Sequence, residues 1–263
     1  MWNLTLSDRS FPGVPPEAIF ERAGRTGIPK LLVHDESLRP IRKRRLGLLR
    51  SRDMEDWRGV SQRAEELDYS RPRLHALRFE RLRAGVRLTG WAIAPRSPHL
   101  GDASRVRQYV LTAAAATAFL GARGLLLEGI DQWELNEAVS FIRHLLPALG
   151  GLHLTLWLRL SATSPFLSEL PRKFVAAIRP WIALDLEDAL PEDFRSLWAA
   201  VSASTSMVLF RYEPEFLDWW DREGRPLLKR TEFAGELVVT FPEIWGKDWR
   251  VWKQWVQEHG LLS

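Results

Sequence analysis

Residues 152–160 read LHLTLWLRL, and this stretch decides the fold class. Leucine fills every second position, and Thr155, Trp157 and Arg159 stand between the last leucines. Side chains of a strand alternate between its two faces, so this period of two predicts a strand with one wholly apolar face. We expect that face to pack on helices and the three other residues to point the opposite way.

Similar short apolar runs recur along the chain and alternate with segments of helical periodicity. The runs lie at residues 3–7, 30–34, 87–93, 124–128, 152–160, 181–187, 206–212 and 236–241. Eight strand and helix pairs in 263 residues match the usual size of a (β/α)8 barrel. An open doubly wound sheet is the alternative, but no glycine-rich dinucleotide or phosphate-loop motif follows the first run. The sequence therefore predicts an α/β fold, a single (β/α)8 TIM barrel.

Composition excludes several classes of protein. The chain has 46% hydrophobic residues, enough for a large core, and no cysteine. Disulfides, thiolate zinc sites and cysteine nucleophiles are therefore ruled out. No apolar run approaches the roughly 20 residues of a membrane helix, and residues 1–10 show no basic, apolar leader. We expect a cytoplasmic protein without membrane contact.

One region departs from the regular alternation. We expect residues 1–263 to form one barrel domain, with an irregular basic insertion at about 39–87. This segment holds 15 basic and seven acidic residues, whereas the rest of the chain is acidic. A solvated helical face explains such a bias, and a phosphate-binding face is the alternative. Its densest basic cluster, at residues 42–45, lacks interleaved aromatic residues, so a nucleic-acid partner is not expected.

Alternation along the strands also predicts which side chains meet at the carboxyl ends, where barrel enzymes carry their sites. The candidate acids and bases are His34, Glu128, Asp185 and Glu187. The candidate ligand contacts are Trp91, Trp157, Arg159, Arg211, Glu213 and Thr240. Charges inside a barrel are costly unless paired, so we expect Arg159 and Arg211 to flank Asp185 and Glu187 in ion pairs.

Several segments carry a family resemblance. They are SDRSFP at residues 7–12, AGRTG at 23–27, PHLG at 98–101, AAATA at 114–118 and LGA at 120–122. In this order they resemble the xylose-isomerase-like barrels, which include sugar isomerases, sugar epimerases and apurinic endonucleases. The resemblance covers most of the chain and implies a small-molecule site at the carboxyl ends of the strands.

The resemblance further implies a divalent metal held by Glu on strand five, Asp on strand six, His on strand seven and Glu on strand eight. Only Asp185 matches this pattern. Arg159, Arg211 and Thr240 lie at the other ends, and none is a comparable metal ligand. We therefore expect no metal site and identify no cofactor. A guanidinium in place of the metal would supply a permanent cation.

These residues predict a divergent isomerase-like or epimerase-like barrel that binds a polyhydroxylated or anionic ligand, such as a sugar or sugar phosphate. Glycoside hydrolysis is one alternative, because Glu128 and Glu213 end two strands and this chemistry needs two carboxylates. A non-catalytic barrel that binds a partner or nucleic acid is the other. The sequence does not decide among oligomeric states.

Overall fold

The protein is described by a computed structural model. The described residues are 3–12, 14, 16–35, 71–95, 97, 103–174, 179–187, 190–241, 254 and 257–258. Most of the basic insertion, residues 39–70, lies outside this range. Its last part forms helix α3 (Arg71–Arg83) and begins the third strand.

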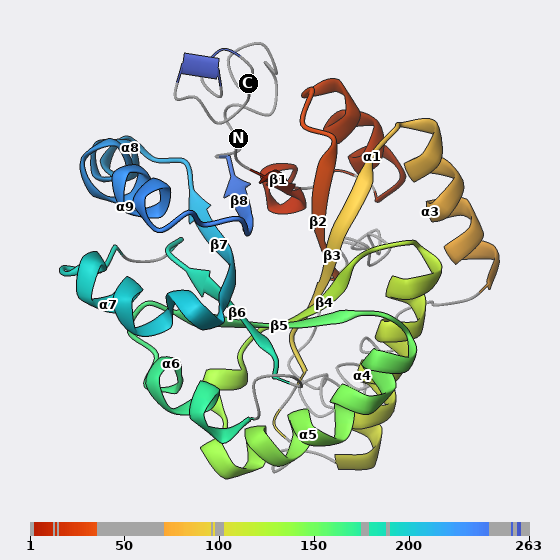
Figure 1. Cartoon of the computed structure of the whole chain (residues 1–263). Coiled ribbons are helices and arrows are strands. Elements are labelled where there is room, and N and C mark those ends of the chain that lie inside the picture. The colour runs from red at the N-terminus through yellow and green to blue at the C-terminus, as the bar shows by residue number, and fades with distance from the viewer. Residues whose placement is uncertain are drawn as a thin grey trace, which may run out of the picture.

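Eight parallel strands close into one barrel, each hydrogen-bonded to its neighbours in chain order (Figure 1). They are β1 (Asn3–Ser7), β2 (Lys30–His34), β3 (Arg87–Ile93), β4 (Gly124–Leu127), β5 (Thr155–Ser161), β6 (Trp181–Asp185), β7 (Thr205–Arg211) and β8 (Glu236–Thr240). The strand β1 pairs with both β2 and β8, and this pairing closes the ring. The structure thus confirms the predicted (β/α)8 fold and every predicted strand, with ends that shift by up to three residues.

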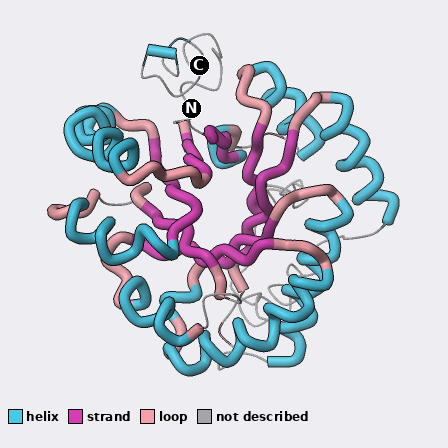
Figure 2. The backbone as a smooth tube through the Cα atoms, viewed as in Figure 1, coloured by secondary structure: helices cyan, strands magenta, loops and turns pink. Residues whose placement is uncertain are grey.

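Helices surround the barrel on its outside, as the ring of strands inside a ring of helices shows (Figure 2). The α-helices besides α3 are α1 (Pro16–Arg25), α4 (Ala103–Phe119), α5 (Leu135–Gly151), α6 (Phe166–Glu169), α7 (Phe194–Val201), α8 (Pro214–Trp219) and α9 (Arg225–Arg230). In the described ranges, short 3-10 turns follow two of the strands, η1 (Asp8–Ser10) directly after β1 and η4 (Ile130–Gln132) after β4. Among the described residues, none of the helices has the length and apolar character needed to cross a membrane.

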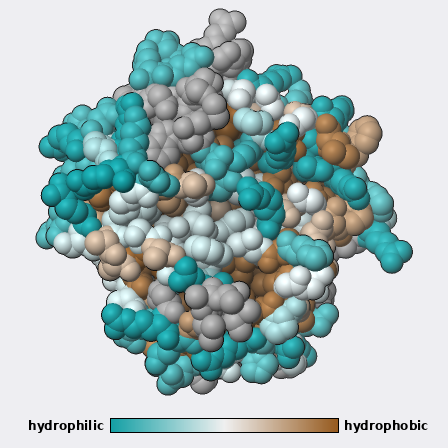
Figure 3. Space-filling view, viewed as in Figure 1, coloured by the Kyte–Doolittle hydropathy of each residue, from teal (hydrophilic) through white to brown (hydrophobic). Residues whose placement is uncertain are grey.

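The hydrophobic core has two shells. The outer shell, between strands and helices, contains Leu154, Leu156, Leu158 and Leu160 of the alternating stretch 152–160. The inner shell fills the barrel and consists of Leu32, Ala92, Leu126, Trp157, Ala183, Met207, Leu209 and Val238. Alternate residues of β5 therefore face opposite sides, as their period of two predicts. In the space-filling view, hydrophilic residues dominate the outer ring of the molecule (Figure 3).

A large inward tryptophan requires small neighbours on the adjacent strands. A Cβ atom at Gly124 would lie 2.3 Å from Cζ3 of Trp157, and one at Gly90 would lie 3.0 Å from the same atom. The Trp157 indole also donates a hydrogen bond from Nε1 to Oγ of Ser206, at 2.9 Å. These glycines leave the space that the ring fills, and the barrel interior is packed rather than hollow.

Candidate functional site

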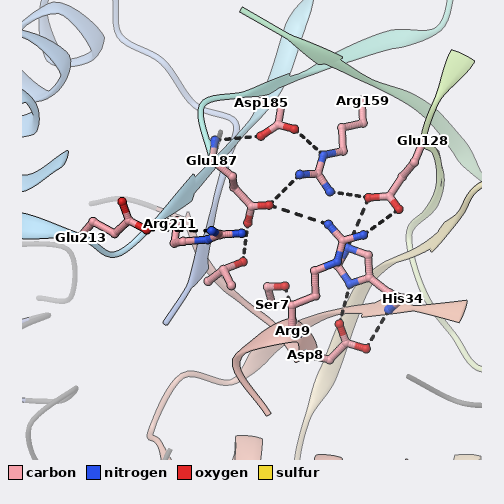
Figure 4. Close-up of polar contacts among 11 residues, drawn as sticks. Ser7, Asp8, Arg9, His34, Glu128, Arg159, Asp185, Glu187, Arg211 and Glu213 are labelled. Atoms are coloured by element: carbon pink, nitrogen blue, oxygen red, sulfur yellow. Dashed lines mark hydrogen bonds and ion pairs between the residues drawn. The ribbon is translucent and has the colours of Figure 1, made fainter. Parts of the chain in front are cut away.

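The carboxyl ends of the strands, called here the barrel mouth, bring charged residues from five strands and a threonine from a sixth together (Figure 4). They lie near or directly beyond the strand ends, whereas the residues deeper in the barrel form the apolar inner shell. The group comprises Asp8 and Arg9 after β1, His34 of β2, Glu128 after β4, Arg159 of β5, Asp185 and Glu187 of and after β6, and Thr240 of β8. Asp8, His34, Asp185, Glu187 and Thr240 are buried.

The guanidinium of Arg159 is the centre of the site. Its Nε lies 2.6 Å from Oδ2 of Asp185, its Nη1 2.5 Å from Oε1 of Glu128, and its Nη2 2.6 Å from Oε2 of Glu187. Only 11% of the side chain is exposed. Burial lowers the pKa of this group, but the charges of Asp185, Glu187 and Glu128 outweigh burial and raise the pKa. The Arg159 cluster, meaning Arg159 with these three carboxylates, therefore holds a permanent cation.

A second guanidinium reaches two of the same carboxylates. Arg9 Nη2 lies 3.0 Å from Oε2 of Glu128, and Arg9 Nη1 lies 3.8 Å from Oε2 of Glu187. Thr240 donates a hydrogen bond from Oγ1 to Oε1 of Glu187. Two arginines thus bridge the same pair of glutamates, Arg159 while nearly buried and Arg9 with a third of its side chain exposed.

A buried histidine and aspartate adjoin this cluster. His34 Nδ1 lies 2.5 Å from Oδ1 of Asp8, and the backbone N–H of His34 donates to Oδ2 of Asp8 at 2.8 Å. Nε2 of His34 lies 3.5 Å from Oε1 of Glu128. Burial lowers the pKa of His34, but the charges of Asp8 and Glu128 together raise it to about 9. The ring is therefore an imidazolium at neutral pH.

The balance between burial and neighbouring charge differs between two of the carboxylates. Burial raises the pKa of Glu128, but His34, Arg159 and Arg9 reverse that effect and hold the pKa well below its usual range. Burial raises the pKa of Asp185, and the opposing charge of Arg159 does not fully cancel the shift. Glu128 is thus a fixed anion, poorly suited to donate a proton as a general acid.

The structure contradicts the predicted direction of Trp91. Its ring belongs to the outer shell, and Nε1 donates to Oδ1 of Asp35 at 3.4 Å. The cause is an irregularity in β3, where Leu31 pairs with Leu88 but Leu32 pairs with Gly90. The extra residue reverses the alternation beyond it, so Ala92 rather than Trp91 faces the interior.

The rim residues also differ from expectation. Arg159 does bind Asp185 and Glu187, but Arg211 does not flank them. Arg211 is 46% exposed, and its ion pair, at 3.9 Å, joins it to Glu213, which is 52% exposed. It is the last residue of β7, where its side chain clears the barrel edge and stays in water. Trp157 points inward as expected, yet it packs in the inner shell.

Sequence reasoning missed Asp8 and Arg9 as site residues. Both lie in η1, one residue beyond the strand alternation that was used to assign directions. Their position in the sequence could have indicated them, because they are an acidic and a basic residue directly after a barrel strand, and barrel sites lie at that end of the strands. Ser7 Oγ accepts from the backbone N–H of Arg9 at 3.3 Å and so helps to form the turn.

The fold family implies a metal, and the donor set argues against one in the Arg159 cluster. Three carboxylates converge there, but each already faces a guanidinium nitrogen at 2.5 or 2.6 Å. Within the part of the chain that the structure describes, no group of three or more His, Asp or Glu residues is arranged to hold a metal ion. These residues therefore do not fit a divalent metal.

Comparison of the structure with solved proteins identifies its fold. The chain is similar to 3-keto-D-glucoside 4-epimerase from E. coli, with 9% identity, a TM-score of 0.64, and 97% of this chain and 99% of that chain covered. It is also similar to a xylose isomerase domain protein from Planctomyces limnophilus, with 12% identity, a TM-score of 0.61 and coverage of 98% and 96%.

An uncharacterized protein from Parabacteroides distasonis matches with 12% identity, a TM-score of 0.65 and 97% of both chains covered. No protein-family model matches the sequence, and no curated protein does. The chain thus has the fold of the xylose isomerase-like TIM barrels, and the resemblance drawn from its sequence is confirmed at the level of the fold.

Proposed function

We propose that the barrel mouth binds a small polyhydroxylated ligand, a sugar or a sugar phosphate, for isomerase-like or epimerase-like chemistry. The observation that carries this proposal is the Arg159 cluster, three carboxylates around one buried guanidinium at the end of the barrel where such folds bind ligands. A charged layer of this kind is costly, and the cost is offset where a ligand uses it.

The residues of the site suit hydroxyl groups. Oxygens of Glu128, Asp185 and Glu187 retain lone pairs beyond those directed at Arg159, and these accept hydrogen bonds from ligand hydroxyls. Arg9 and Arg211 are partly exposed and supply donors for hydroxyl or phosphate oxygens. The cation of the site is part of the chain, so we expect binding that does not depend on added metal.

Glycoside hydrolysis by Glu128 and Glu213 is less well supported. That chemistry needs one carboxylic acid with a raised pKa beside a second carboxylate. The pKa of Glu128 is lowered by His34, Arg159 and Arg9 despite its burial, and Glu213 is half exposed on the rim. Neither residue has the environment of a general acid.

Thermal denaturation with a panel of ligands tests the proposal. The panel is D-fructose, D-glucitol, D-gluconate, D-ribose 5-phosphate and 2-deoxy-D-ribose 5-phosphate, each with EDTA and with Mg²⁺ or Mn²⁺. A ligand at 100 times its Kd stabilises by about 2.7 kcal/mol, which raises Tm by several degrees for a chain of this size. We expect such a shift in EDTA.

Arg211→Ala separates a ligand role from a structural role. Because Arg211 is exposed, its loss is expected to leave Tm nearly unchanged and to weaken binding of the sugar phosphates. Arg83→Ala is the matched control, since Arg83 is also exposed and pairs only with Glu80 on α3 in the described residues. No Tm shift with any panel member would refute the proposed function, and a shift that requires metal would refute the role of Arg159.

A further inference from the structure

A buried group of the mouth has a feature that the Arg159 cluster does not explain. His34 is 2% exposed, and its Nε2 has no hydrogen-bond partner among the described residues. Nε2 lies at ion-pair distance from Oε1 of Glu128, 3.5 Å, but makes no hydrogen bond there, and a buried polar N–H without a hydrogen bond costs free energy. The ring points from β2 toward Glu128 and the mouth (Figure 4).

Asp8 fixes the orientation of this ring. It binds the Nδ1 side of the ring through Oδ1 and the backbone N–H of the same residue through Oδ2. This two-point contact places the ring and assigns a proton to Nδ1, as a carboxylate bound to one nitrogen of a functional histidine does. Nε2 is then the atom left to face the mouth, and Asp8 is a positioning residue.

The surroundings of Nε2 specify what it can bind. The nearest charged atom is Oε1 of Glu128 at 3.5 Å, and that oxygen already accepts from Arg159. On the far side of the same carboxylate, Oε2 accepts from Arg9. Nε2 and Oε1 therefore form a donor and an acceptor side by side, a little farther apart than two oxygens on adjacent carbon atoms.

We propose that His34 Nε2 and Glu128 Oε1 together bind two hydroxyl groups on neighbouring carbons of the ligand, the first accepting a hydrogen bond from Nε2–H and the second donating one to Oε1. This assignment rests on the proposed function and adds to it a specificity-determining pair. A ligand with a single isolated oxygen at this point satisfies only one of the two atoms.

Nuclear magnetic resonance of the imidazole nitrogens tests the donor directly. With ¹⁵N-labelled histidine, we expect both nitrogens of His34 to be protonated at pH 7. His34→Gln identifies the signal, and His144→Gln is the control, because His144 is exposed on α5 and contacts the Ser140 carbonyl. Asp8→Asn should lower the pH at which His34 loses its proton. A neutral His34 at pH 7 would overturn the proposal.

Two probes that differ by one hydroxyl test the oxygen pair. D-ribose 5-phosphate has hydroxyls on adjacent carbons, and in its ring form 2-deoxy-D-ribose 5-phosphate has none. We expect the ribose compound to shift the Nε2 signal and to bind about tenfold or more tightly than the deoxy compound. In His34→Gln, checked for folding by circular dichroism, this preference should largely disappear.

The outcomes separate the two proposals. If both probes bind equally and Nε2 does not shift, the oxygen-pair assignment is wrong and the proposed function stands. If only another panel sugar binds, equal affinity for that sugar in wild type and His34→Gln would show that the oxygen-pair assignment is wrong while the proposed function stands. If no panel member binds to the intact protein, the proposed function fails and the assignment fails with it.

Discussion

Replacing Arg159 with alanine tests the central contact of the mouth most severely. The guanidinium is 11% exposed and faces carboxylates that are 12%, 8% and 3% exposed, so few of these charges can be reached by water. Removing one partner of a buried ion pair costs about 3–5 kcal/mol. Arg9 still faces Glu128 and Glu187 in the variant, so we expect a loss within this range rather than a multiple of it.

The stability difference between wild type and Arg159→Ala should depend on pH, because part of it comes from the ionised Glu128 carboxylate. The pKa of Glu128 is depressed in the folded protein, so its contribution to stability is present above the unfolded pKa of about 4.3 and is lost as pH falls through the folded value. Arg159 supplies part of that depression. The free-energy difference between wild type and Arg159→Ala should therefore be largest near pH 7 and should shrink below about pH 4.

Urea unfolding followed by tryptophan fluorescence measures the difference at pH 7.5 and at pH 3. The control, Arg83→Ala, removes an exposed arginine that lies 2.7 Å from Glu80 and should change stability by less than about 1 kcal/mol. The variant should also regain stability with Mn²⁺, because three converging carboxylates are then left to a cation. A loss under about 1 kcal/mol at pH 7.5, or one equally large at pH 3, would refute the reasoning.

Three further predictions concern stability. Gly124→Ala should cost several kcal/mol in urea unfolding because its Cβ would lie 2.3 Å from the Trp157 ring, whereas Gly150→Ala, with nothing within 4 Å, should be neutral or stabilising. Glu236→Gln at the amino end of the barrel should destabilise by about 3 kcal/mol and leave ligand affinity unchanged, since this buried carboxylate binds two cations. The pKa of His34 is raised to about 9, so its contribution to the free energy of unfolding is complete below about pH 6.5 and is lost as pH rises through 9. Between these two pH values, the free energy of unfolding of wild type should fall by about 3 kcal/mol relative to that of His34→Gln.

The fold was predictable because apolar residues recur along the strands with the same two-residue period as side chains on one face. In β5 the leucines and the polar residues lie on opposite faces, so the phase of the strand could be determined from the sequence. The predicted direction of the side chain was wrong at Trp91, because one extra residue in β3 reverses which face the following residues occupy. A hydrogen-bond register is a property of two strands together, and the sequence of one strand does not reveal such a shift.

The candidate site was predictable in part for the same reason. Arg159, Asp185 and Glu187 follow from strand phase, and the structure brings them into contact. Asp8 and Arg9 lie in a turn, where no period predicts side-chain direction. Arg211 has the inward phase but ends its strand, so its side chain reaches water instead of the cluster. The limits of the prediction are thus the limits of regular strand geometry.

The position of the charges along the barrel axis suits a mouth that is stable and would still bind the proposed ligand. Arg159 binds three carboxylates from below, at positions where the protein excludes most water, and so it fixes their geometry. Arg9 binds two of the same groups with a third of its side chain in solvent, so exchanging its contacts for those of a ligand costs less desolvation. His34 adds a donor whose orientation Asp8 fixes independently of both arginines. A ligand that entered would therefore displace contacts of Arg9 first and leave the Arg159 cluster intact. Substitution of Arg9, like that of Arg211, should thus alter affinity more than stability.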